Sequence, residues 1–211
     1  MHFTLLALTL MSQSPSVPTN PEKAYSIFVS KVQAFTEKKD LSGLRAVRSA
    51  AKDPFQQIVA NAYAYSIGDS SAKEPLLHAL GAGHKWLAII PATEGNGAGL
   101  VWPVVWDVIT EIAKQGEPRA IRGMFAMANV ADGAASEGMS GAIGEFLSKK
   151  PALVIQNWSM IHEFSNALSA GYEFGIPAAS LPKLRKEYSR GFSSQPKFRD
   201  EILSLLSSPR E

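Results

Sequence analysis

The chain contains no cysteine, and this absence excludes several kinds of chemistry. Disulfide bonds, thiolate metal ligands, cysteine nucleophiles and lipid attachment at a cysteine all require a thiol. Histidine is also scarce: the sequence has 4, and none has a second histidine at the i, i+4 spacing of a helical zinc site. His162-Glu163 matches only half of such a motif, because Asn166 stands where the second histidine would be. The sequence therefore predicts no metal site and no bound cofactor.

Charge is also limited. Charged residues make up 19% of the chain, below the fraction of about a quarter that is usual in soluble domains, and the formal net charge is +2. No run of Lys or Arg exceeds a pair, so nucleic-acid binding is not predicted. No apolar run reaches the roughly 18 residues of a membrane-spanning helix, so no transmembrane segment is predicted either.

A short apolar segment, FTLLALTLM, occupies residues 3–11, and a stretch rich in Ser and Pro follows it. An apolar run of this length before polar residues is typical of a secretory signal peptide. We therefore interpret residues 1–19 as a signal peptide and linker, and predict a periplasmic or secreted protein of a bacterial cell. Two alternatives stay open: a disordered N-terminal tail, or a true start at Met11.

Signals for the start of a helix recur through residues 20–211. Proline suits the first turn of a helix, and Asp, Asn or Ser before it can accept hydrogen bonds from unpaired N–H groups. Apolar residues then repeat at helical spacing, whereas residues 165–177 are predicted to be a looser connection. The starts are Asn20-Pro21, Asp40, Asp53-Pro54, Pro75, Pro103, Pro118, Asp132, Pro151, Ser180 and Gln195-Pro196. The pattern predicts one all-α domain of antiparallel helical hairpins, forming an irregular α-solenoid or bundle.

We expect residues 116–151 to be the centre of this fold, as two helices joined by a tight turn. Their apolar faces are Ile121, Met124 and Phe125 in the first helix, and Met139, Ile143 and Phe146 in the second. The second helix also carries Gly138, Gly141 and Gly144, each costing about 1 kcal/mol relative to Ala. Three glycines in one helix indicate that another backbone approaches closely.

Two segments resemble known helical-repeat families. Residues 60–69, ANAYAYSIGD, resemble the first helix and turn of a tetratricopeptide repeat, although Pro75 falls within the expected second helix. Residues 116–147 are similar to a HEAT-type helical pair, without the acidic and basic residues often found in its second helix. The resemblance implies helical hairpins with a packing surface for a protein partner. It transfers no functional residue.

The longest irregular segment, residues 91–99, contains Gly95, Gly97 and Gly99. A dinucleotide-binding loop would require its third glycine one position later, between a strand and a helix, so phosphate binding is not predicted there.

Aromatic and polar side chains lie in and around this glycine-rich loop. Tryptophan faces beside carboxylates can line a cleft for a small molecule such as a saccharide. The candidate ligand-binding residues are Trp86, Glu94, Asn96, Trp102 and Asp107. In the alternative interpretation, Trp102 and Trp106, four residues apart, are core aromatics of one helix. No catalytic set is identified.

These patterns predict a helical protein-binding or scaffold module whose partner is another protein. The alternative is a small helical enzyme or ligand-binding protein that uses the loop around Glu94.

If residues 1–19 are a cleaved signal and linker, protein isolated from its native cell should begin between Gln13 and Thr19. Intact-mass measurement of that protein reads the first residue directly. A cytosolic protein that retains Met1, or that begins at Met11 or Ser12, would contradict export.

Overall fold

The computed structural model describes residues 21–81, 102–131 and 133–208. These ranges contain helices and turns but no strand, which confirms the predicted all-α class. The α-helices are α1 (Pro21–Glu37), α2 (Leu41–Ala50), α3 (Pro54–Ser66), α4 (Lys73–Gly81), α6 (Trp102–Lys114), α7 (Pro118–Val130), α8 (Gly133–Lys149), α9 (Pro151–Ile161), α10 (Ser165–Ala170), α11 (Leu181–Gly191) and α12 (Pro196–Leu205). Two 3₁₀ turns, η1 (Ser70–Ala72) and η5 (Ala178–Ser180), and a π-helical segment, η4 (Gly171–Gly175), complete the described part. Within it, no helix has both the length and the apolarity needed to cross a bilayer.

Most predicted helix starts are confirmed, and the caps explain why. The Asp40 carboxylate accepts a hydrogen bond from the N–H of Gly43 at 2.9 Å, and Asp53 caps α3 in the same way at 2.9 Å from Gln56. Two details differ. Ser180 makes no side-chain capping bond, because it already has helical backbone angles at the end of η5. Asp132 lies outside the described residues.

Helix α4 begins at Lys73 rather than at Pro75. The Asp69 side chain accepts a hydrogen bond from Ser71 N and starts the turn η1 earlier, and α4 continues directly from it. Pro75 is then in the first turn of α4, where a missing N–H leaves no intrahelical bond unmade.

The predicted loose connection at residues 165–177 is wrong. This segment forms α10 and the π-helix η4, and it buries Leu168, Tyr172 and Ile176. The helix start is capped from another helix: Asn129 Oδ1 of α7 accepts a hydrogen bond from the N–H of Asn166 at 3.1 Å. The capping group is 37 residues away in the chain, so no local pattern reveals it.

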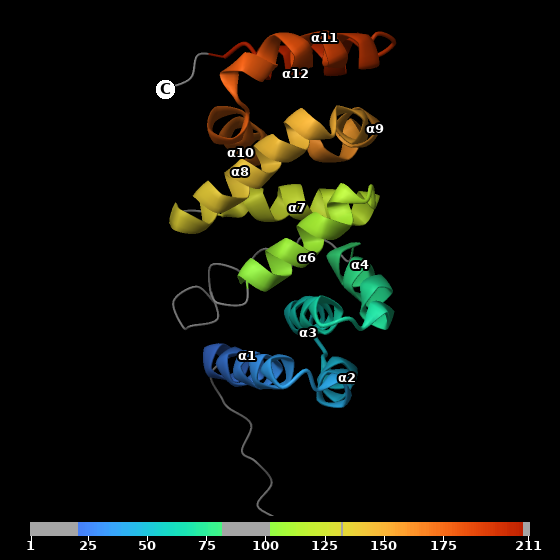
Figure 1. Ribbon diagram of the computed structural model, residues 1–211, viewed down its shortest axis with the longest axis vertical. Helices are drawn as coiled ribbons and strands as arrows, with labels where there is room; N and C mark the ends of the chain where they lie inside the picture. The colour runs from blue at the N-terminus through green and yellow to red at the C-terminus, as the bar shows by residue number, and fades with distance from the viewer. Residues whose placement is uncertain (1–20, 82–101, 132, 209–211) are drawn as a thin grey trace, which may run out of the picture.

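The helices follow approximate chain order along the longest axis of the molecule, with α1 and α2 at one end and α11 and α12 at the other, while α10 lies level with α9 and beside α8 (Figure 1). The most extensive contact joins α8 with η4, and the next join α6 with α7, α3 with α4, α10 with α7, and α3 with α6. The buried apolar side chains form one cluster that runs from Val29 to Leu206. The arrangement as antiparallel hairpins stays a prediction.

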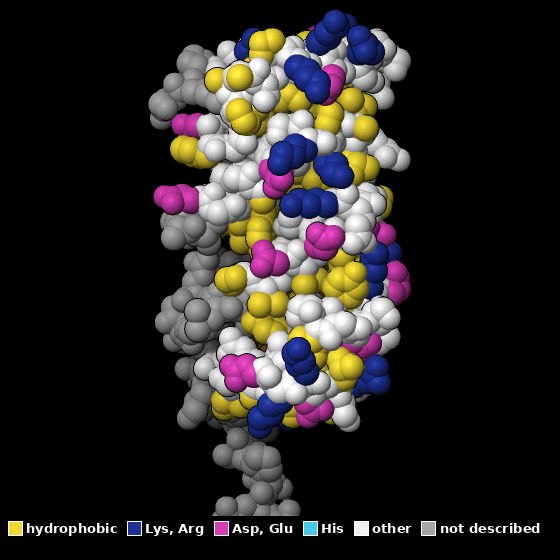
Figure 2. Space-filling view, in the orientation of Figure 1, with side chains coloured by type: hydrophobic (Ala, Val, Ile, Leu, Met, Phe, Trp, Pro, Cys, Tyr) yellow, Lys and Arg dark blue, Asp and Glu magenta, His cyan; other side chains and the backbone are white. Residues whose placement is uncertain are grey.

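Ion pairs connect neighbouring layers of this stack, and Figure 2 shows basic and acidic side chains lying together along one face. The inter-element pairs include Glu74–Arg119 at 2.7 Å between α4 and α7, Lys114–Glu145 at 3.5 Å between α6 and α8, and Arg122–Glu163 at 3.1 Å between α7 and the turn after α9.

The two helices expected at the centre do contact each other. Phe125 of α7 and Phe146 of α8 pack edge to face, with ring centroids 6.0 Å apart, and both side chains are buried. Helix α7 also contacts α4, α6, α9 and α10, so its surface is covered on several sides.

The predicted close approach of another backbone to α8 is confirmed, and it occurs at Gly144. A Cβ at Gly144 would collide with the backbone of Gly171 and Gly175 in η4. A Cβ at Gly175 would lie 2.6 Å from Gly144 Cα. A Cβ at Gly138 or at Gly141 would have no described atom within 4 Å apart from its chain neighbours and the backbone of α8. Gly144 therefore permits direct packing of helix on π-helix.

Replacing Gly144 with Ala should destabilise the protein by about 2 kcal/mol, because the added methyl group has no room between the two backbones. The matched change Gly138→Ala, in the same helix but in open space, should stabilise it by up to about 1 kcal/mol through helix propensity. Urea denaturation followed by circular dichroism measures both. Equal effects of the two changes would contradict the backbone contact.

Candidate functional site

The loop site predicted around Glu94 is only partly covered by the structure. Trp86, Glu94 and Asn96 lie outside the described residues. Trp102 is the first residue of α6, and Asp107 is exposed on the same helix. Trp106 is 8% exposed and belongs to the core, as the alternative interpretation of that tryptophan expected. The loop site itself stays a prediction.

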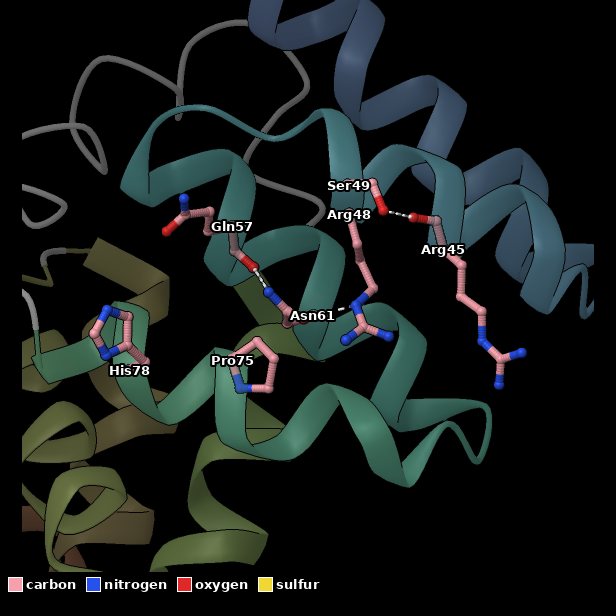
Figure 3. Close-up of a pocket in the computed structure, with 7 residues that line it drawn as sticks. All are labelled: Arg45, Arg48, Ser49, Gln57, Asn61, Pro75 and His78. Atoms are coloured by element: carbon pink, nitrogen blue, oxygen red, sulfur yellow. Dashed lines mark hydrogen bonds between the residues drawn. The ribbon is translucent and has the colours of Figure 1, made fainter.

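A different candidate site lies among α2, α3 and α4, where the structure has a pocket of about 480 Å³. Helix α2 contributes two arginines and a serine, α3 two amide side chains, and α4 a proline and a histidine (Figure 3). The lining residues are Arg45, Arg48, Ser49, Gln57, Asn61, Pro75 and His78.

Arg48 is held in a fixed position at the middle of this pocket. Its Nε donates to Asn61 Oδ1 at 2.7 Å, its Nη1 to Asp69 Oδ2 at 2.9 Å, and its Nη2 to the carbonyl oxygen of Ser71 at 3.1 Å. Asn61 is oriented in turn, because its Nδ2 donates to the carbonyl oxygen of Gln57 at 2.6 Å. The Arg48 side chain is 14% exposed; its bonds to Asn61 and Asp69 are partly buried, and its bond to Ser71 is exposed.

Asp69 is the buried anion of the network, with a side chain that is 2% exposed. Its Oδ1 accepts hydrogen bonds from the hydroxyl and N–H of Ser71 at 2.6 and 3.1 Å. Its Oδ2 accepts from Arg48 and, at 3.2 Å, from Arg45 Nε. The Ser71 hydroxyl bond and then Arg45 lower the pKa of Asp69 to about 2, against the opposing effect of burial. Asp69 is therefore ionised at neutral pH and fixes both arginines.

The pocket has an excess of positive charge. The charged residues in its lining are Arg45 and Arg48, and Asp69 balances only one of these two arginines. Such a surface suits an anion rather than a metal ion. In the described ranges, no group of three or more His, Asp or Glu residues is placed to hold a metal.

A second, smaller pocket of about 230 Å³ lies between α9, α10 and α12. Glu201 of α12 accepts a hydrogen bond from Trp158 Nε1 at 3.3 Å and lies 3.7 Å from His162 Nδ1. The His162 ring also packs against Phe198, with centroids 5.4 Å apart. These contacts bind α12 to α9, and Glu201 is further engaged by Lys197 at 4.0 Å. We therefore interpret this pocket as part of the packing between the last helices.

The residues that form the first pocket could be recognised in the sequence one by one, but the helical pattern does not show that they lie together. Arg45 and Arg48 are three residues apart, hence on one face of α2, and Asp69 follows the turn at Gly68. The tetratricopeptide-like segment thus supplies both Asn61 and Asp69 to the network. His162 and Glu163, adjacent in sequence, have separate partners: His162 Nδ1 lies 3.7 Å from Glu201, and Glu163 pairs with Arg122.

No protein-family model, curated protein or solved structure matches the chain. The resemblance of residues 60–69 and 116–147 to helical-repeat families stays a prediction.

The variant Asp69→Asn should lower the free energy of unfolding by about 2 kcal/mol or more at pH 7, because the depressed pKa corresponds to that much linked stability. The folded pKa is below the unfolded one, so this contribution is complete above about pH 4 and is lost as the pH falls toward about 2. The difference in the free energy of unfolding between the wild type and the variant, measured by urea denaturation, should therefore become smaller as the pH falls from about 4 to about 2.

Asp200→Asn is the control, since Asp200 pairs with Arg199 but its side chain is 68% exposed. That change should alter stability by less than about 0.5 kcal/mol. If the stability difference between the wild type and Asp69→Asn does not change with pH, that result would contradict the depressed pKa of Asp69.

Proposed function

We propose that this chain is a helical scaffold module that binds another protein, and that it acts after export from the cell. The observation that carries the proposal is the stacking of the helices in approximate chain order along one axis (Figure 1). An elongated stack exposes the sides of many helices along a continuous surface, as helical-repeat proteins do when they bind partners.

The π-helix η4 supplies a candidate anchor for such a partner. Phe174 is 70% exposed, the most exposed of the large apolar side chains in the described ranges. The backbone beneath it is fixed, because Gly175 packs directly on Gly144 of α8 and the neighbouring Tyr172 donates from its hydroxyl to the carbonyl oxygen of Ser208 at 2.7 Å. π-Helical turns occur often at functional sites. A rigidly presented aromatic side chain is also the residue type that dominates binding energy at protein interfaces.

The experiment places a photo-crosslinking phenylalanine analogue at position 174 of the exported protein and identifies the proteins that it captures in the native cell. Each captured protein is then purified, and its dissociation constant is measured with the unmodified chain. We expect Phe174→Ala to weaken binding at least tenfold while the melting temperature stays unchanged, because the side chain contributes little to the fold.

The matched control is Ile27→Ala in α1, which also truncates an exposed apolar side chain, here 53% exposed, near the other end of the stack. It should leave binding unchanged. Failure to capture any protein at position 174, or equal weakening by both changes, would count against the proposal.

A further inference from the structure

The pocket among α2, α3 and α4 has hydrogen-bond donors that the fold does not use. Arg45 Nε is held by Asp69, but its two Nη groups make no hydrogen bond to the described residues, and its side chain is 61% exposed. His78 makes none either, and it lies on the opposite side of Arg48 and Asn61 from Arg45 (Figure 3). Donors therefore face solvent from two sides of one pocket.

The acidic groups near these donors are already engaged. Both oxygens of the Asp69 carboxylate accept hydrogen bonds within the network. Glu74 of α4 pairs with Arg119 at 2.7 Å. Asp53 lies immediately before α3, and its side chain caps that helix. The lining of the pocket itself contains no carboxylate. Asp69 neutralises only one of the two arginine charges, so one positive charge is not balanced inside the pocket.

We propose that this pocket binds an oxyanion, namely a carboxylate or phosphate group. The planar Nη groups of Arg45 form a fork that matches two oxygens of such a group. Because Asp69 already orients the guanidinium, binding requires little further loss of side-chain freedom. The proposal goes beyond the scaffold function, because free phosphate can bind this pocket without a protein partner. An acidic peptide would offer the same oxyanion chemistry through its carboxylates.

The test titrates the full-length chain with sodium phosphate and, separately, with hexaglutamate, using isothermal titration calorimetry at pH 7. Ionic strength is kept constant with sodium chloride, since non-specific attraction to a basic surface weakens with salt. Hexaglutamine serves as the uncharged peptide control.

The decisive variant is Ser49→Glu, which places a carboxylate in the pocket wall. The Ser49 hydroxyl bonds only to the carbonyl oxygen of Arg45 within α2 and is exposed, so the Asp69 network is left intact. The matched control is Ser189→Glu, which makes the same charge change at an exposed position of α11, in the last layer of the stack. A second variant, Arg45→Gln, removes the fork itself. Circular dichroism melting checks that each variant is folded.

We expect at least one probe to bind, with affinity reduced at least tenfold by Ser49→Glu, clearly reduced by Arg45→Gln, and unchanged by Ser189→Glu. Binding of phosphate would identify a small-anion source, and binding of hexaglutamate alone would identify an acidic peptide. Absence of binding by both probes, or equal weakening by Ser49→Glu and Ser189→Glu, would overturn the proposal without affecting the test at Phe174.

Discussion

The burial of helix α7 is the interaction on which the rest of the described structure depends. Its apolar residues face α4 and α6 on the N-terminal side and α8, α9 and α10 on the C-terminal side. Seven of its side chains between Ala120 and Ala128 are buried apolar groups, and burial of apolar area is the main force that favours folding. Because α7 contacts helices on both sides of it in the stack, it joins the two halves of the described structure.

The ion pairs between neighbouring layers have a different role from the buried apolar side chains. The Glu74–Arg119 and Arg122–Glu163 pairs are partly exposed, and such pairs contribute at most about 1 kcal/mol each. Their value lies in selecting which helices meet, because a shifted layer would lose its partner charge. The Arg48–Asp69 network is more deeply buried, so its loss would leave an uncompensated charge and cost more.

Local chemistry made the helical class and most helix starts predictable. Asp40 and Asp53 cap helices through bonds to residues three positions ahead, and such bonds are visible in sequence. Residues 165–177 were not predictable in this way, because Asn129 and Gly144 stabilise them from distant positions. The same holds for the pocket: Arg48 meets Asp69 across 21 residues, and only the packing of α2 on α3 brings them together.

The chain-order stack has a mechanical consequence. The first and last described helices lie at opposite ends of the molecule (Figure 1), so tension applied through the two ends passes through the layers in series. Each interface then carries the full force, and the weakest one separates first, while the remaining layers keep their own neighbours. Extension should therefore proceed stepwise, because the continuous apolar core is opened at one interface between layers at a time.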